Sequence, residues 1–162
     1  LGLDSVEVEM LSPPSFARIL EQDSVAVVDL SSSRAFRRGH ISGAKHAVRS
    51  RLEKFIATVP PTKWLVFTSE DGVLARFAAR EASHWTEASA AALMGGNRAW
   101  RDAGYEMMSG STGIESDPDD VWLRPYDDTE NVEQAMRDYL NWEVDLVAQI
   151  DRDGAAQFAK WD

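Results

Sequence analysis

Short apolar runs alternate with amphipathic stretches along the first two thirds of the chain. Three of the runs are almost continuously apolar, which is typical of strands buried on both faces of a parallel sheet. They are residues 24–30 (SVAVVDL), 63–68 (KWLVFT) and the alanine-rich 88–94. Two shorter strands are expected at residues 6–10 and 45–48.

The stretches between these runs show helical spacing. The sequence Ser12-Pro13-Pro14 predicts a helix start, because proline is tolerated in the first turn. Strands that alternate with helices predict an α/β domain with a mainly parallel sheet. Ligands of such sheets usually bind beyond the carboxyl ends of the strands, so the loops after Leu30 and Thr68 are of interest. The further expected helices are at 31–38 (a short turn), 51–59, 74–85 and 97–103, with glycine-marked loops at 39–44 and 69–72.

The last third of the chain differs in composition. Residues 109–120 are rich in Ser, Gly, Asp and Pro and predict a linker. Asp127 or Asp128, with Glu130 placed for a capping box, predicts a long helix that runs to Ile150. An apolar stripe on that helix is expected to pack on the body, on another domain or on another subunit. The stripe consists of Val132, Met136, Tyr139, Leu140, Val144, Leu146, Val147 and Ile150.

The net charge of −10 is carried by this tail. Residues 1–110 hold 13 basic and 13 acidic residues, whereas residues 111–162 hold 4 basic and 14 acidic ones. The split predicts a compact body with an acidic appendage. It argues against nucleic acid as a partner, because phosphate contacts need a basic face.

Several site classes and settings are excluded or disfavoured by composition. The chain has no cysteine, which excludes disulfides, thiolate zinc sites, iron–sulfur ligation and a cysteine nucleophile. No apolar run is long enough for a membrane span, and no membrane partner is expected. No targeting signal is visible, so a cytoplasmic setting is expected. Since the chain begins at Leu1 and not at Met, we expect a piece of a longer protein.

Four segments of the chain are distinctive when taken together and in order. They are VVDL at 27–30, GHISGA at 39–44, WLVFTSEDG at 64–72 and MGGNRAWRDAG at 94–104. Together they resemble the rhodanese (thiosulfate sulfurtransferase) family, in which matching segments stand in the same order. The resemblance implies a rhodanese-like three-layer α/β domain with a five-stranded, mainly parallel sheet, extended here by the acidic C-terminal helix. It also implies structural roles for Asp29, Gly39, His40, Gly43, Gly95, Gly96 and Trp100.

The chain departs from the family at the catalytic loop. In the family, a cysteine at the start of a six-residue loop takes a sulfane sulfur as a persulfide and passes it to an acceptor. Here Ser69 stands at that position, Leu74 replaces a basic residue, and Ser31 and Ala35 replace an Arg and a Glu. No catalytic residue is therefore assigned. The degenerate loop consists of Ser69, Glu70, Asp71, Gly72, Val73 and Leu74.

Two interpretations of this loop stay open. Glu70 and Asp71 can satisfy the amides of the next helix as a cap, and they would repel an incoming anion. Alternatively, the inward-facing amides bind a residual anion. Ser69 as a nucleophile would need an adjacent base.

The remaining polar residues suggest no separate centre. The candidate bases for Ser69 are His40, His46 and His84. Asp29 is either a catalytic acid or, as its place at a strand end favours, a buried acceptor. Asp117, Asp119 and Asp120 lack the glycine and distal glutamate of a calcium loop, so neither metal nor cofactor is expected.

Three functions follow from these observations. The first is a non-catalytic rhodanese-like domain of a longer sulfurtransferase, with a structural, regulatory or oligomerisation role. The second is an anion- or protein-binding module built on the degenerate loop. The third is a serine-based enzyme of unknown class. The expected organisation is a rhodanese-like domain at 1–110, an acidic linker at 111–127 and a helical extension at 128–162. The expected partners are other rhodanese domains of the parent chain, or a second copy, bound through the helix at 128–150.

Overall fold

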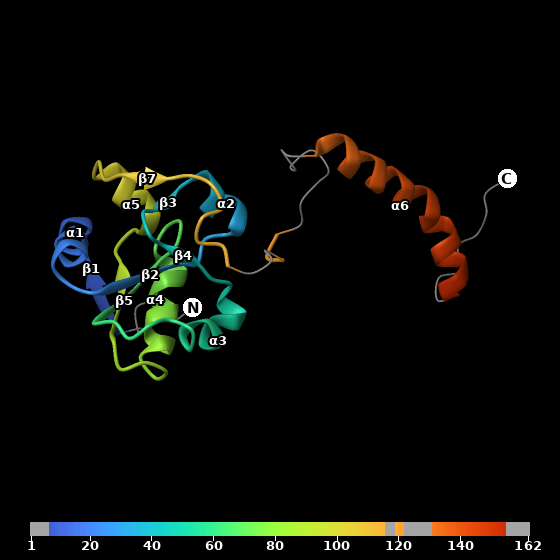
Figure 1. Cartoon of the computed structure of the whole chain (residues 1–162). Coiled ribbons are helices and arrows are strands. Elements are labelled where there is room, and N and C mark those ends of the chain that lie inside the picture. Colours follow the sequence, from blue (N-terminus) through green and yellow to red (C-terminus); the bar gives the residue numbers. More distant parts are fainter. Residues whose placement is uncertain (1–6, 116–118, 122–130, 155–162) are drawn as a thin grey trace. The chain divides into compact units, whose positions relative to one another are not determined.

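The computed structural model describes residues 7–115, 119–121 and 131–154 (Figure 1). The chain divides into two compact units, Leu1–Val121 and Trp122–Asp162. The predicted boundaries at residues 110 and 128 stay predictions. Each unit is described by itself below.

The first unit is built on a parallel five-stranded sheet with the strand order β1-β6-β5-β2-β4, which confirms the predicted fold class. Crossovers through helices join the parallel strands, as such sheets require. The strands are β1 (Glu9–Leu11), β2 (Val25–Asp29), β4 (Lys45–His46), β5 (Trp64–Thr68) and β6 (Ser89–Leu93). The helices are α1 (Pro13–Gln22), α2 (Ser33–Arg38), the short 3₁₀ turn η2 (Arg49–Arg51), α3 (Leu52–Ile56), α4 (Val73–Ala82) and α5 (Gly96–Asp102).

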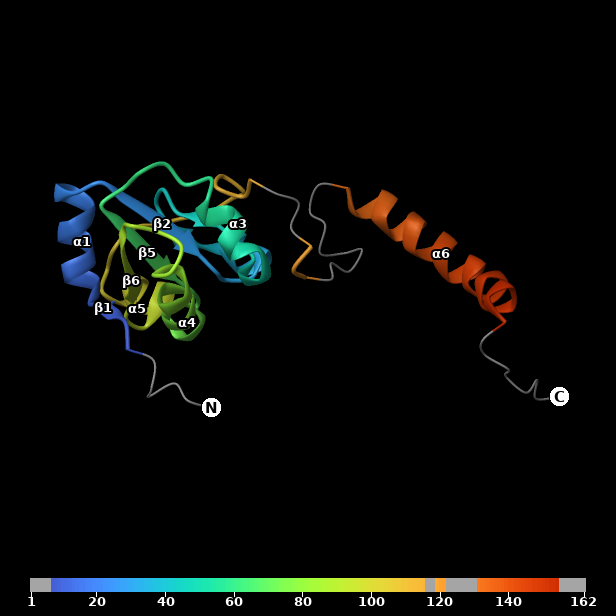
Figure 2. The same cartoon turned by 90° about the horizontal axis from the view of Figure 1, so that it is seen from below.

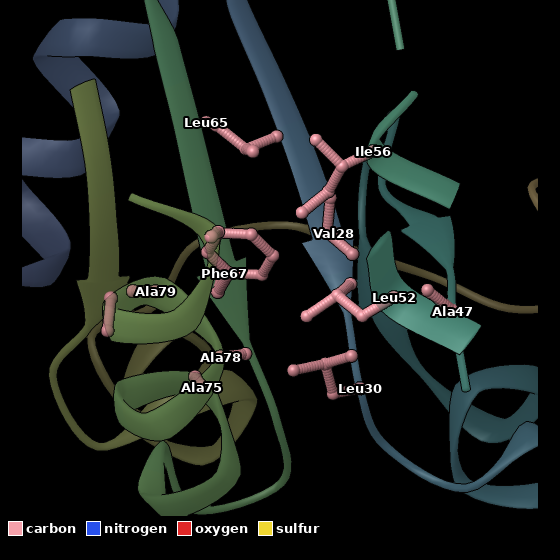
Figure 3. Packing of buried hydrophobic residues seen from close by; sticks show 12 residues of the cluster. Val28, Leu30, Ala47, Leu52, Ile56, Leu65, Phe67, Ala75, Ala78 and Ala79 are labelled. Atoms are coloured by element: carbon pink, nitrogen blue, oxygen red, sulfur yellow. The ribbon is translucent and has the colours of Figure 1, made fainter. Parts of the chain in front are cut away.

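One face of the sheet packs against α3 and α4. Figure 3 shows Val28 of β2 and Leu65 and Phe67 of β5 directed toward these two helices. Small residues on α4 let that helix approach the strands closely, because its own contribution to this layer is no longer than a methyl group. The alanines of α4 in this cluster are Ala75, Ala78, Ala79 and Ala82, each fully buried.

The opposite face packs against α1, α2 and α5. Phe16, Phe36 and Trp100 come from these three helices and contact Val27 and Val66 of the central strands. Figure 2 shows α1 on the side of the sheet opposite to α3 and α4. Alternate residues of β2 and β5 thus enter different cores, which explains why their sequences read as continuous apolar runs.

A second, two-stranded sheet was not predicted. β3 (His40–Ile41) pairs antiparallel with β7 (Met107–Met108), so part of the segment expected to be a loop forms a short strand. Each of these strands has two residues, too few to show an alternating pattern in the sequence. The pairing closes the end of the domain over α2 and α5 (Figure 1).

The predicted helices are present with shifted ends. Ser12 caps α1 by accepting a hydrogen bond from the Ser15 amide at 3.3 Å, as the Ser-Pro-Pro start predicts. The helix expected at 74–85 runs from Val73 to Ala82, with Ser83 as its C-cap and the Ser83 hydroxyl donating to the Arg80 carbonyl. The helix expected at 51–59 is replaced by η2 and the shorter α3.

The second unit contains α6 (Val132–Asp153). In the described residues, α6 follows Asn131, which makes no side-chain capping bond. The predicted capping residues Asp127, Asp128 and Glu130 lie outside the described residues, so the predicted start stays a prediction. Within the second unit, the stripe residues Val144 and Val147 are 77% and 67% exposed. Among the described residues, no helix has the length and apolar character needed to span a membrane.

Candidate functional site

The loops that follow β2, β5 and β6 border one cleft of about 400 Å³. They meet because the carboxyl ends of parallel strands lie at the same edge of a sheet. Ser31 follows β2, and Glu70 and Asp71 follow β5. Asn97 lies in the first turn of α5, the helix that follows β6. The two loops singled out from the sequence therefore lie side by side.

The loop after β5 is closed by its own side chains. The Ser69 Oγ accepts a hydrogen bond from the Gly72 amide at 3.0 Å, and the Asp71 Oδ1 accepts one from the Val73 amide at 3.0 Å. Ser69 is 2% exposed. Two amides at the start of α4 are thus satisfied internally, in the way that helix caps satisfy them.

Gly96 brings the loop after β6 against the loop after β5. A Cβ atom at Gly96 would lie 2.0 Å from the Ser69 carbonyl oxygen and 2.4 Å from the Gly72 nitrogen. The Asn97 amide also donates to the Ser69 carbonyl at 2.8 Å. Since Gly96 has a φ of +61°, both its conformation and its surroundings require glycine. Gly95 also has a positive φ, and a Cβ there would meet Ala99.

A buried polar network lies beneath the cleft and includes residues that the sequence did not single out. Asp29 is fully buried, and its two oxygens accept from the Ser31 amide at 2.8 Å and from the Asn97 side-chain amide at 2.7 Å. The same Asn97 nitrogen lies 3.1 Å from the Ser31 Oγ, and the Thr68 hydroxyl donates to Asn97 Oδ1 at 2.9 Å. The network satisfies the buried carboxylate, so Asp29 is an acceptor in this arrangement.

Each of the three histidines lies within hydrogen-bond distance of a backbone carbonyl, and none of them is paired with Ser69. His40 Nδ1 lies 2.8 Å from the Phe36 carbonyl, and the two rings stack with centroids 3.8 Å apart. His46 Nε2 lies 3.0 Å from the Ser31 carbonyl. His84 is exposed, with its Nδ1 3.2 Å from the Glu81 carbonyl. The structure therefore does not bring a base to the buried Ser69 hydroxyl.

The walls of the cleft carry charges of both signs. Arg38 comes from α2, Arg98 and Arg101 come from α5, and Glu70 and Asp71 come from the loop after β5. Within the part of the chain that the structure describes, the Arg38 and Arg98 guanidinium groups form no ion pair or hydrogen bond, and Arg101 is 3.7 Å from Asp102.

Asp120 lies against the body, although its position in the predicted linker suggested a solvated residue. Its Oδ2 accepts a hydrogen bond from the Ser33 amide at 2.7 Å and lies 3.8 Å from His46 Nε2. Burial alone would raise the pKa of Asp120. Hydrogen bonds from Ser33 and the attraction of His46 outweigh that effect, so its pKa lies below the ordinary value of 3.8.

The other residues with expected structural roles have identifiable contacts. The Trp100 indole nitrogen donates to the Glu106 carbonyl at 3.1 Å, and the ring stacks on Tyr105 at 4.2 Å. Gly43 has a φ of +76° in open space, whereas Gly39 is extended and its amide bonds to the Ala35 carbonyl at 3.1 Å.

A family model for the rhodanese-like domain matches residues 12–103 of the chain. The chain belongs to the rhodanese-like domain family. The five-stranded parallel sheet is therefore that of a rhodanese-like domain, as the sequence resemblance predicted.

Solved structures agree with this assignment. The rhodanese-like domain is 31% identical to a thiosulfate sulfurtransferase from Pseudomonas aeruginosa, with a TM-score of 0.83 over 96% of this chain. The match covers 30% of the Pseudomonas protein, so this chain spans less than a third of that relative. It is 28% identical to a Rhodopseudomonas palustris protein described as a possible tyrosine phosphatase, with a TM-score of 0.58 over 65% of this chain and 90% of that one.

A more distant structure shows the fold alone. It is a rhodanese-like domain protein from Staphylococcus aureus, 19% identical, with a TM-score of 0.52 over 63% of this chain and all of that one. No curated protein matches the chain. Among the described residues of the rhodanese-like chain, no group of His, Asp or Glu side chains is arranged to hold a metal ion.

We predict that Gly96→Ala destabilises the domain far more than Gly104→Ala. At Gly96 the new methyl group meets two backbone atoms, whereas at Gly104, where φ is +83°, nothing lies within 4 Å. The expected loss is about 3 kcal/mol or more for Gly96→Ala and about 1–2 kcal/mol for Gly104→Ala. Unfolding in guanidinium chloride measures both, and equal losses would show that the close approach to Ser69 is unimportant.

We predict that Asp120→Asn removes a pH-dependent part of the stability. Because the pKa of Asp120 is lowered by folding, its carboxylate stabilises the protein above the ordinary value of 3.8, and this contribution is lost as pH falls through the lowered pKa. The variant should therefore be less stable at pH 7, by about 1–2 kcal/mol, with the gap closing as pH falls through the lowered pKa. The matched control, Asp119→Asn, removes an exposed ion pair with Arg51 and should cost about 0.5 kcal/mol or less.

Proposed function

We propose that this chain is a non-catalytic rhodanese-like domain of a longer sulfurtransferase-related protein, with a structural or regulatory role. The observation that carries the proposal is Ser69 at the position of the family's persulfide cysteine. A hydroxyl group cannot hold a sulfane sulfur, and the chain has no cysteine that could replace it. The buried Ser69 Oγ supports the proposal, because it accepts the Gly72 amide as a helix cap does.

The altered loop supports the same role. Glu70 and Asp71 place two carboxylates at the rim where an anionic sulfur donor would approach, and a like charge at about 4 Å opposes such a donor by about 4 kcal/mol at an effective dielectric constant near 20. Leu74, which is 43% exposed, offers no positive charge in compensation.

The Pseudomonas aeruginosa relative supports a place within a longer protein. It is described as a thiosulfate sulfurtransferase, and this chain, including its C-terminal unit, matches less than a third of it. We therefore propose that the domain accompanies other rhodanese domains in one polypeptide.

The apolar stripe of α6 provides the proposed contact with such a neighbour. Tyr139, Leu140, Val144 and Val147 are exposed in the second unit, and an apolar helix face of this width needs a partner. The rest of α6 is acidic, with Glu133, Asp138, Glu143, Asp145, Asp151 and Asp153 against Arg137 and Arg152. A second copy would bring like charges together, so we propose an apolar surface flanked by basic residues on a sister domain.

A binding module is the second candidate function, and one observation favours it. The guanidinium groups of Arg38 and Arg98 line the cleft without partners among the described residues. Arginine is suited to carboxylates and phosphates. The cleft is therefore an anion-binding candidate despite the acidic loop.

A catalytic serine and a phosphatase receive no support. Ser69 is buried and bonded to Gly72. The Rhodopseudomonas palustris relative is described as a possible tyrosine phosphatase. The phosphatases related to rhodaneses need a seven-residue loop that begins with Cys and ends with Arg, and the loop that begins at Ser69 supplies neither.

We predict that the chain produces no thiocyanate from thiosulfate and cyanide above the buffer blank, and that Ser69→Cys alone restores little activity. With Ser69→Cys alone, the loop at residues 69–74 would regain its thiol but keep Glu70, Asp71 and Leu74. Adding Glu70→Gln, Asp71→Asn and Leu74→Arg to Ser69→Cys removes two negative charges and adds a positive one. The combined variant should be at least about tenfold more active than Ser69→Cys.

Mass spectrometry supplies the second readout for these variants, because a persulfide adds the mass of one sulfur atom to the protein. Turnover by the unmodified chain would refute the proposed non-catalytic role. Full sulfurtransferase activity of Ser69→Cys alone would show that the loop still binds the anionic donor and has lost only the thiol.

We predict that the isolated chain is monomeric at low salt, since the acidic faces of two α6 helices repel each other. Analytical ultracentrifugation measures this directly. A dimer that Val144→Asp dissociates, while the control Asp145→Asn leaves it intact, would contradict the proposed sister domain and assign the stripe to a second copy.

A further inference from the structure

Two described pieces of the chain beyond the rhodanese-like sequence match lie along the body. They are residues 113–115 and residues 119–121, called the strap below. The Gly113 carbonyl accepts the His46 amide at 2.9 Å, Glu115 pairs with Lys45, and Asp119 pairs with Arg51. These three partners come from β4 and η2.

Gly113 fixes the path of the first piece. Its φ is +100°, and a Cβ atom there would lie 2.4 Å from the Ala44 carbonyl oxygen and 3.2 Å from the Phe36 ring. Only glycine allows the strap to pass so close to the body. The two ion pairs are exposed, and exposed ion pairs contribute little to stability.

Asp120 anchors the second piece. Its side chain is 12% exposed, and its Oδ2 accepts the Ser33 amide at 2.7 Å. Ser33 is the first residue of α2, and two further amides of this helix have local acceptors: Ser32 Oγ accepts from Ala35 and the Ser32 carbonyl from Phe36. Asp120 therefore completes the cap of α2 from a distance of 87 residues in the sequence.

The anchor lies directly behind one wall of the cleft. Ser31, and Ala35 and Arg38 of α2, line that wall. Asp120 bonds to the first turn of α2 and lies 3.8 Å from His46 Nε2, which contacts the Ser31 carbonyl at 3.0 Å. Ser31 in turn bonds to Asp29 and Asn97. Only one or two contacts separate the strap from the cleft.

We propose that Asp120 is a latch through which docking of the strap holds the α2 wall of the cleft in place. With the latch closed, α2 is capped and the Ser31 carbonyl is fixed through His46. With the latch open, the Ser33 amide loses its acceptor, α2 loosens at its first turn, and the Arg38 side chain changes its position relative to Asn97. Admission of ligands to the cleft then depends on whether the strap is docked.

The test compares Asp120→Ala with Asp119→Ala in the full chain. Amide hydrogen exchange of residues 33–38, followed by NMR, reports on α2, and the side-chain amide resonances of Asn97 report on the cleft. Asp120→Ala should speed exchange at Ser33 by about tenfold or more, because a hydrogen bond to a charged acceptor is lost, and should shift the Asn97 resonances. Asp119→Ala should leave both unchanged, since it removes only an exposed ion pair.

Exchange at residues 65–67 of β5 serves as the folding control. If Asp120→Ala loses protection there, the variant has unfolded globally. Asp120→Asn is then tested in place of Asp120→Ala. It keeps an oxygen acceptor for Ser33, so a smaller acceleration of Ser33 exchange is expected. Unchanged exchange at Ser33 in Asp120→Ala would overturn the latch, as would equal acceleration in Asp119→Ala. Faster exchange in α2 with unmoved Asn97 resonances would overturn its link to the cleft.

Discussion

The buried carboxylate of Asp29 is the interaction on which the arrangement of the cleft depends. A buried carboxyl group needs hydrogen bonds, and Asp29 receives them from Ser31 on its own loop and from Asn97 in the first turn of α5. Asn97 also accepts from Thr68 at the end of β5. Asp29 and Asn97 thus link the ends of β2 and β5 to the start of α5, and this linkage sets the geometry of the cleft.

The proposed non-catalytic role distinguishes residues that hold the loops together from residues that would carry out sulfur transfer. Asp29, Gly95 and Gly96 bring the loops together and make contacts that depend on their identity. Ser69 and Leu74 stand where the sequence resemblance places a cysteine and a basic residue. Under the proposed role, the fold serves its surface and its packing.

The fold was largely predictable because most of its elements are indicated by sequence signals that lie within the element itself. The apolar runs of β2 and β5 and the Ser-Pro-Pro start of α1 each reveal an element within a few residues. The short pair of β3 and β7 was missed because Met107 and Ile41 are distant in the sequence and neither strand is long enough for a pattern. The same reason hid the polar network: Asn97 is 68 residues from Asp29 and only folding shows that they meet.

The strand order also determines when this domain can finish folding during synthesis. β1 (Glu9–Leu11) lies at the edge of the sheet and pairs only with β6, whose residues 89–93 leave the ribosome some 80 residues later. The central pair of β2 and β5 can form well before that, but the first strand to be made has to wait for the last strand of the sheet. Such distant pairing slows folding, because a long loop must close before the contact forms. Until then, the apolar face of α1 has no completed sheet to cover, and a nascent chain halted before residue 93 would expose it to chaperones.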